Sequence, residues 1–161
     1  LAAYFWEGRF EGGKRNKNYS IYQHFYTSKK MNLHLQIIGF ILTTLAIVHA
    51  IFPRYFHWKT EFESVSLINR QIMYVHTFFI ALVILLMGLL CLTSSKEIIE
   101  TPLGNKIALG LAVFWTLRLL FQFFGYSSEL WRGKKFETVV HILFSVLWTY
   151  VSSVFWWIYL T

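Results

Sequence analysis

The sequence is poor in charge and lacks one acidic residue type altogether. Its 161 residues include no aspartate, one cysteine and two prolines, and only 14% of them are charged. Soluble domains carry about 25% charged residues, so an ordinary water-facing surface is excluded. The single cysteine, Cys91, excludes an internal disulfide and a C-x-x-C motif. Without aspartate, no metal-bound histidine can be oriented by an Asp side chain.

Apolar residues are abundant instead. They make up 56% of the chain, and 20% of the residues are aromatic. Four apolar stretches of about 20 residues are each long enough to cross a hydrocarbon core of about 30 Å as a helix. They cover about residues 33–52, 72–92, 107–126 and 139–160. Open strands are excluded because lipid cannot satisfy their edges. The sequence therefore predicts an all-α, four-helix transmembrane bundle in a multi-pass membrane protein.

Short connections between the spans predict antiparallel neighbours. The longest connection is loop 1, between the first two spans, and it contains "TEFE". This matches a capping box with Thr60 as N-cap and Glu63 at N3. We therefore expect a short interfacial helix in loop 1 that leads into the second span.

Residues 1–30 differ from the rest and hold six Lys/Arg. They lack the order of segments that marks a signal peptide. We expect a polar tail, disordered or upstream of a true start at Met31, and a transmembrane domain over residues 31–161. Loop 1 and loop 3, which joins the third and fourth spans, together carry six Lys/Arg, and loop 2, which joins the second and third, carries two. The tail lies on the same side as loop 2, so the numbers of positive charges on the two sides are nearly equal and the orientation stays open. The net charge of +7 marks the membrane ends rather than a nucleic-acid footprint.

Polar residues within the spans gather on one side of the predicted bundle. Antiparallel packing places four of them at one depth on the side of loops 1 and 3: His49, His76, Gln122 and His141. Arg118 lies one turn deeper. Trp115, Arg118 and Gln122 share one face of the third span by their i, i+3 and i+7 spacing. We refer to this predicted arrangement as the polar layer.

Arg118 is costly inside a membrane, by about 2.5–3.5 kcal/mol on insertion scales. One interpretation is structural: the guanidinium pairs with Glu137 and fixes the helix register. The other is that Arg118 binds a lipid phosphate or another anionic ligand, because guanidinium and phosphate match bidentately. A third is a role in proton or ion movement.

The three histidines of the polar layer raise a second hypothesis. His49, His76 and His141 could hold a metal ion, or two of them a haem iron. They form no spaced local motif, and equal depth does not fix helix rotation. Cys91 lies in the other leaflet, so no Cys–His pair forms and nucleophilic catalysis has no support. The sequence favours a non-enzymatic protein that requires no cofactor, with haem or a metal ion as the alternative.

Three segments carry a resemblance to a known group: "HAIFPRYFHWKTEF", "LINRQIMYV" and "FWTLRLLFQFF". Over about residues 33–160 the chain resembles an uncharacterised family of small four-span bacterial integral membrane proteins. The resemblance implies four helices in a bacterial inner (plasma) membrane and no established activity. It also draws Asn69, Arg70 and Gln71 into the candidate site with Arg118 and Gln122, where the first three would roof the polar layer at the membrane surface.

The function hypotheses follow from these residues. The first is an accessory subunit or a binder of a lipid-like or anionic ligand, with six candidate ligand-binding residues: Arg118, Gln122, Glu137, Asn69, Arg70 and Trp115. The rival is a haem- or metal-binding redox protein that uses the three histidines. A transporter is less favoured, because the second span is apolar below His76. The expected partners are the bilayer and a larger membrane complex or a second copy of the chain, and not nucleic acid.

Overall fold

The computed structural model describes the backbone of residues 2–161 and the side chains of residues 22–161, those at positions 24 and 128 excepted. Within these limits helices are the only regular secondary structure. The four long helices are α1 (Ala2–Tyr55), α3 (Leu67–Thr93), α5 (Pro102–Phe124) and α6 (Lys135–Leu160). Three short ones connect them: α2 (Trp58–Glu61), α4 (Ser95–Glu100) and the 3-10 helix η1 (Ser128–Leu130). The predicted all-α fold is confirmed.

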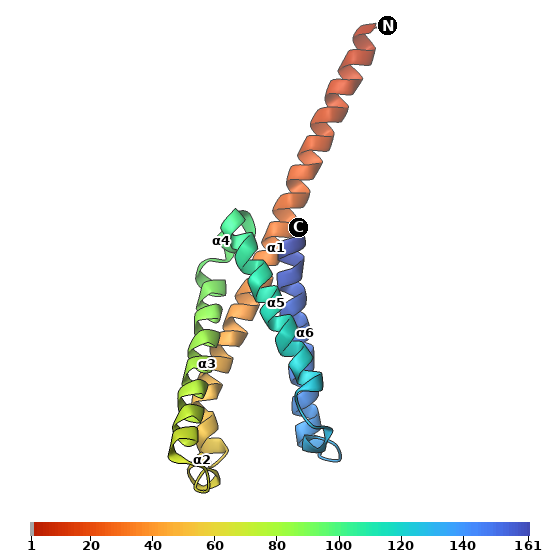
Figure 1. The fold of residues 1–161 in the computed structure, drawn as a ribbon. Coiled ribbons are helices and arrows are strands. Elements are labelled where there is room, and N and C mark those ends of the chain that lie inside the picture. The colour runs from red at the N-terminus through yellow and green to blue at the C-terminus, as the bar shows by residue number, and fades with distance from the viewer. Residues whose placement is uncertain (1) are drawn as a thin grey trace.

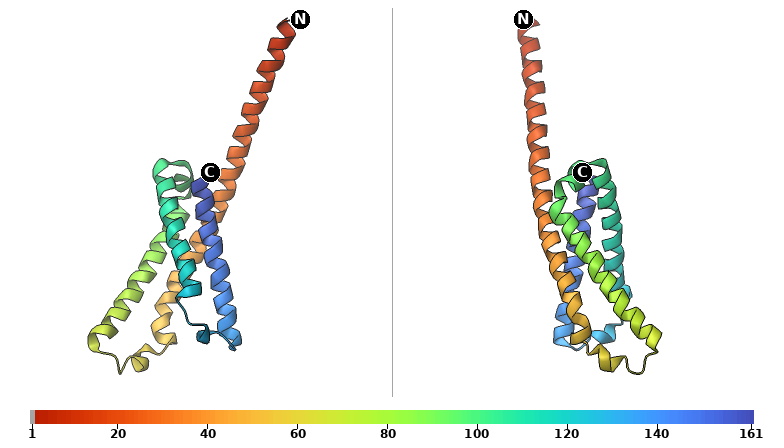
Figure 2. Two further views of the ribbon diagram at one scale, coloured as in Figure 1. Left: turned by 45° about the vertical axis from the view of Figure 1, so that its right-hand side comes forward. Right: turned by 90° about the vertical axis from the view of Figure 1, so that its left-hand side faces the viewer.

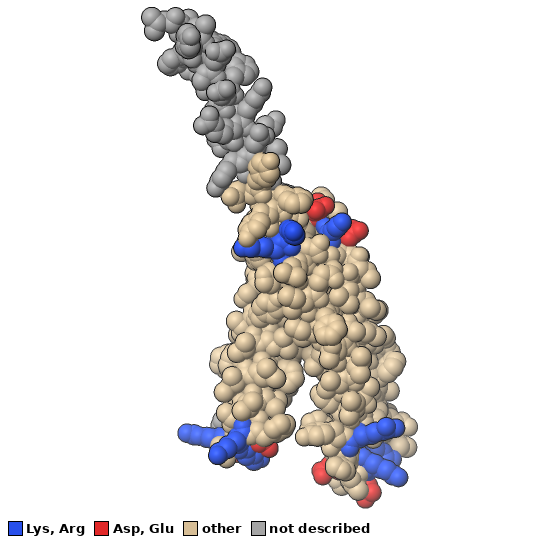
Figure 3. Space-filling model, turned by 180° about the vertical axis from the view of Figure 1, so that it is seen from behind, with Lys and Arg blue, Asp and Glu red and all other residues tan. Residues whose placement is uncertain are grey.

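Each long helix contains a segment that is long and apolar enough to cross a membrane, in α1 the part from Phe25 to Tyr55. In the space-filling view, Lys, Arg and Glu side chains lie at the two ends of the molecule, with an uncharged belt between them (Figure 3). This distribution is the one that a bilayer requires, because a charged side chain facing hydrocarbon has no solvating partner. The chain is a small multi-pass membrane protein.

The four long helices pack in two pairs, α1 with α3 and α5 with α6. Each pair is an antiparallel hairpin, as predicted. The two hairpins meet near α4 and the C-terminus and separate toward loops 1 and 3 (Figures 1 and 2). We call the end of the molecule near α4 and the C-terminus the closed end, and the end that carries loops 1 and 3 the open end. The space between the separated hairpins is called the wedge. Contacts between the hairpins come from α1 with α4 and α6, and from α4 with α5.

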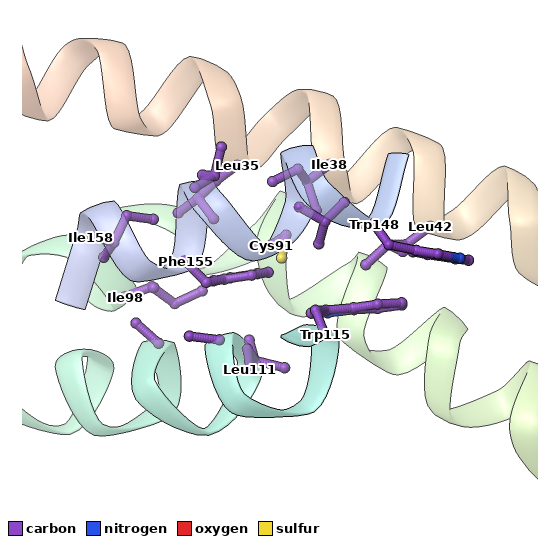
Figure 4. Packing of buried hydrophobic residues seen from close by; sticks show 14 of the residues in the cluster. Leu35, Ile38, Leu42, Cys91, Ile98, Leu111, Trp115, Trp148, Phe155 and Ile158 are labelled. Carbon is purple, nitrogen blue, oxygen red and sulfur yellow. The ribbon is translucent and has the colours of Figure 1, made fainter. Parts of the chain in front are cut away.

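The hydrophobic core lies in the part of the molecule where the hairpins meet. Side chains from α1, α3, α5 and α6 interdigitate there (Figure 4). Trp115 of α5 stacks on Trp148 of α6 with ring centroids 4.8 Å apart, and both rings are almost fully buried. Leu42 of α1 lies beside Trp148. These large side chains mark the level at which the packed core gives way to the wedge.

Polar side chains tie the helices together at the closed end. His34 Nδ1 lies 2.8 Å from Tyr150 Oη, which joins α1 to α6. Gln36 Nε2 donates to the carbonyl oxygen of Leu92, at 3.0 Å, and to Ser95 Oγ, at 3.1 Å. The last carbonyls of a helix have no partner within the helix, and water is scarce in a membrane. The bond from Gln36 therefore provides a donor for one such carbonyl, that of Leu92 at the end of α3.

The predicted capping box in loop 1 is not formed. Thr60 is not an N-cap: α2 begins after His57, and Thr60 Oγ1 donates to the carbonyl oxygen of His57 from inside the helix. The reason is that α1 continues to Tyr55, so the turn falls at His57, whose φ of 48° is left-handed.

The predicted tail is part of a helix: α1 already runs from Ala2, and the part of α1 that packs in the core includes Met31, which is 2% exposed. The contribution of residues 1–30 to folding stays a prediction.

Glycines set the distance between α1 and α3. A Cβ atom on Gly88 of α3 would lie 2.7 Å from Thr43 Oγ1 and 2.9 Å from Thr43 N. A Cβ atom on Gly39 of α1 would lie 2.9 Å from the carbonyl oxygen of Gly88. All three separations are shorter than real Cβ contacts, so the two backbones approach closely only because neither glycine carries a side chain.

We therefore expect Gly88→Ala to push α3 away from α1 and to lower the free energy of unfolding by about 1–3 kcal/mol, as overpacking does. Gly110→Ala is the matched control, because a Cβ atom there meets nothing within 4 Å. It should raise stability by about 0.5–1 kcal/mol through helix propensity. Unfolding in mixed micelles of increasing SDS fraction measures both. Equal shifts in the two variants would contradict the close approach.

Candidate functional site

One face of helix α5 changes from apolar to polar side chains along its length. Trp115 and Leu111 are buried in the core (Figure 4). Seven residues further on, the same face carries Gln122 and Arg118. The side chain of Gln122 is only 6% exposed, and that of Arg118 is half-buried. The face that is apolar at the closed end is therefore polar where the hairpins begin to separate.

Helices α1 and α6 repeat this change. His49 follows Leu42 by seven residues in α1, and His141 precedes Trp148 by seven residues in α6. Leu42 and Trp148 lie together in the core (Figure 4). Two helical turns from that level toward the open end, the same faces therefore present imidazoles.

Arg118, Gln122 and His141 form a chain of hydrogen bonds. Arg118 Nη1 donates to Gln122 Oε1 at 3.2 Å, and Gln122 Nε2 lies 2.9 Å from His141 Nδ1. Guanidinium can only donate, so the amide oxygen of Gln122 must face it and the amide nitrogen must face His141. His141 Nδ1 then accepts, which places the imidazole proton of the neutral ring on Nε2. We call these three residues the polar relay.

The floor of the polar relay is aromatic. The guanidinium carbon of Arg118 lies 5.1 Å from the centroid of the Trp148 ring, within the range of a cation–π interaction. The indole nitrogen of Trp148 lies on the side of the ring away from Phe155, toward the open end (Figure 4). The Nε1 atoms of Trp148 and Trp115 are buried and have no hydrogen-bond acceptor among the described residues. A buried donor without an acceptor costs about 1–3 kcal/mol.

Residues of loop 3 form a roof over the polar relay. Trp131 stacks on His141 with ring centroids 4.0 Å apart and planes inclined by 10°. The backbone of Trp131 is fixed by Thr138 Oγ1, which donates to its carbonyl oxygen at 2.7 Å. The ring of Tyr126 lies 5.9 Å from the guanidinium carbon of Arg118. Aromatic rings thus cover the polar relay on the side of loop 3.

The site is rich in donors and poor in acceptors. Arg118 carries five N–H donors, and Gln122 Oε1 accepts from its Nη1. The indoles of Trp115 and Trp148 add two buried N–H groups without acceptors among the described side chains. Such an arrangement can bind a group with several acceptor oxygens, and a negative charge on that group would compensate Arg118.

The structure separates the remaining predicted ligand-binding residues from this site. Glu137 is exposed near the start of α6, and no ion pair joins it to Arg118 among the described side chains. Asn69 and Arg70 lie in the first turn of α3, in the other hairpin. The sequence reasoning missed Trp148, Tyr126 and Trp131. The spacing of seven residues between His141 and Trp148 is the signal that could have found the first of these.

The predicted histidine group is not brought together either. His49 Nδ1 donates to the carbonyl oxygen of Leu45 at 2.8 Å, and His76 Nδ1 to that of Ile72 at 3.0 Å. His76 is exposed on α3, whereas only His141 belongs to the polar relay. The described residues contain no group of three His, Cys or Glu side chains that could hold a metal ion.

Comparison with known proteins gives no match to a protein-family model, a curated protein or a solved structure. The resemblance of the three sequence segments to a four-span bacterial family therefore stays an expectation.

The central position of Gln122 makes a prediction. Gln122→Leu leaves Arg118 and His141 without their shared partner, so we expect the free energy of unfolding to fall by about 1–3 kcal/mol. In ¹⁵N NMR spectra, the wild-type His141 ring should carry its proton on Nε2, and the variant should lose this single tautomer. Gln71→Leu is the control, because Gln71 is exposed on α3. A mixed tautomer in the wild type would refute the assigned direction of the relay.

Proposed function

We propose that this membrane protein binds an anionic amphipathic ligand in the leaflet of loops 1 and 3, with Arg118 as the residue that holds the anionic group. The observation that carries the proposal is the excess of buried donors around Arg118. The guanidinium carbon lies 5.1 Å from the centroid of the Trp148 ring, whose buried indole N–H has no acceptor among the described residues, and Gln122 supplies one acceptor oxygen. An anionic oxygen group is the chemical complement of such a site.

The charge of Arg118 supports an anion over a neutral ligand. Gln122 accepts a hydrogen bond from Arg118 but carries no charge, and the carboxylate residue Glu137 is exposed. An unpaired charge within a span is expensive, and a bound carboxylate or phosphate would compensate it. Guanidinium binds either group through two parallel hydrogen bonds, which also orients the ligand.

The indoles support a ligand over a purely structural role. A structural arginine needs an acceptor, but it gives no reason for the buried N–H group of the neighbouring Trp148 ring, which has no acceptor among the described residues. The guanidinium carbon of Arg118 lies 5.1 Å from the centroid of the Trp148 ring, so an oxyanion on Arg118 would lie near the indole that carries this N–H. The histidines do not favour the haem or metal hypothesis, because His49, His76 and His141 do not come together among the described residues in a group that could hold a metal ion.

Arg118→Leu tests the proposal. Loss of one charge-assisted contact is worth about 1.5–3 kcal/mol, so retention of anionic lipid by the purified protein should fall about tenfold or more. Mass spectrometry of copurifying lipids measures the change. Arg132→Leu is the matched control, because it removes an exposed loop 3 arginine outside the polar relay. Identical lipid inventories for wild type and Arg118→Leu would refute the proposal.

Trp148→Phe tests the role of the indole separately from that of the charge. It keeps an aromatic floor and removes the buried N–H, so it should weaken retention of anionic lipid while leaving the lipid-free protein folded. Trp156→Phe is the control: its Nε1 already donates to Thr116 Oγ1 at 3.0 Å. It should retain lipid and instead lose stability, by about 0.5–1.5 kcal/mol, through the broken hydrogen bond. Equal lipid retention in the two variants would count against an indole–ligand contact.

A further inference from the structure

The wedge between the hairpins opens sideways into the membrane. In the space-filling view it is a notch between the two legs of the molecule, with uncharged surface above the charged side chains of the open end (Figure 3). The notch narrows toward the closed end, where Leu42, Trp115 and Trp148 fill the core (Figure 4). A molecule in the surrounding leaflet can enter such a notch without crossing the aqueous surface.

The α5 wall of the wedge carries Arg118. Leu111, two turns earlier on the same face, is buried where the hairpins meet. The guanidinium carbon of Arg118 lies 5.1 Å from the centroid of the Trp148 ring, and Trp148 lies beside Leu42 of α1 where the core gives way to the wedge. The half-buried side chain of Arg118 is thus placed at the inner end of the notch.

The α1 wall of the wedge carries His49. Ile38, Leu42 and Leu45 are buried on one face of α1, and His49 continues this face toward the open end. The Nδ1 atom of His49 donates to Leu45, which leaves Nε2 to face a ligand. Ile47 lies on the opposite face of α1 and is 62% exposed.

Depth and cover exclude easy access from water. Arg118 precedes the last residue of α5, Phe124, by six residues, or about 9 Å along the axis. Helix α5 is only slightly longer than the hydrocarbon core, so Arg118 lies within that core. Trp131 and Tyr126 cover the polar relay on the loop 3 side. On that side a dissolved anion would have to cross these rings, and through the open end of the wedge it would have to leave water to reach the depth of Arg118, whereas a lipid already lies beside the notch.

We infer that the ligand is an anionic membrane lipid that enters the wedge laterally, places its acidic group on Arg118 and lies against the His49 face of α1. The inference rests on the proposed function and adds the class of ligand and its route. It follows from three features: the positive charge at the inner end of the notch, the depth of that charge within the hydrocarbon core, and the opening toward the leaflet. The occupant is a lipid rather than a soluble anion, and both hairpins contact it.

The test uses variants that fill the wedge from the α1 side without touching the polar relay. Phosphatidylglycerol retained from mixed phosphatidylcholine–phosphatidylglycerol nanodiscs is measured by native mass spectrometry. We expect His49→Trp to reduce retention about tenfold, because its side chain occupies the notch. Ile47→Trp, which adds a similar side chain on the opposite face, should retain the lipid. Inorganic phosphate added to the wild type should not displace it.

Each outcome decides between the two proposals. Equal retention in His49→Trp and Ile47→Trp, with loss in Arg118→Leu, would overturn the wedge and leave the proposed function standing. Displacement by inorganic phosphate would overturn the lipid in favour of a soluble anion. Equal retention in all three variants would overturn both proposals.

A second measurement uses the wild type, so it does not depend on the folding of His49→Trp. Phosphatidylglycerol with a photoactivatable group in its acyl chain should crosslink to residues 45–52 of α1, and Arg118→Leu should lose these crosslinks. Crosslinks that persist unchanged in Arg118→Leu would show nonspecific contact with the bilayer and would overturn the inference.

Discussion

The contacts that join the two hairpins at the closed end of the molecule determine the rest of the structure. His34 of α1 bonds to Tyr150 of α6 at 2.8 Å, and α4 contacts α1 of one hairpin and α5 of the other. Because the core lies at this closed end, the same helix faces diverge at the other end. The shape therefore follows from where the apolar contacts stop. A bundle that was apolar along its full length would have no reason to open.

The polar residues begin where those contacts stop. Along α5, the core face passes from Leu111 to Arg118 within two turns, and along α6 it passes from Trp148 to His141. Polar groups at these positions weaken close helix packing in lipid unless they find partners. Arg118 has Gln122, but the indole donors beside it have no described acceptor. The same residues thus limit closure of the wedge and give it a chemistry suited to anions.

The sequence predicted the properties that depend on length and composition alone. Four spans, their antiparallel order and the common depth of Gln122 and His141 follow from hydrophobicity and the 1.5 Å rise of a helix. It could not predict properties that depend on helix rotation and pairing. His76 has the expected depth but is exposed on α3. Glu137 has a suitable distance along the chain but lies on the surface. The separation of the hairpins needed the packing itself, and the turn at His57 displaced the predicted cap at Thr60.

The most direct test of this account is a distance between Arg118 and a lipid phosphorus atom. Solid-state NMR can measure ³¹P dephasing of the ¹⁵N-guanidinium signals in bilayers that contain phosphatidylglycerol, with Arg118 assigned from an Arg118→Lys sample. The account predicts strong dephasing of the Arg118 signal, although this residue lies below the level of the bulk lipid phosphates. Dephasing confined to the arginines of the loops, with none for Arg118, would contradict it.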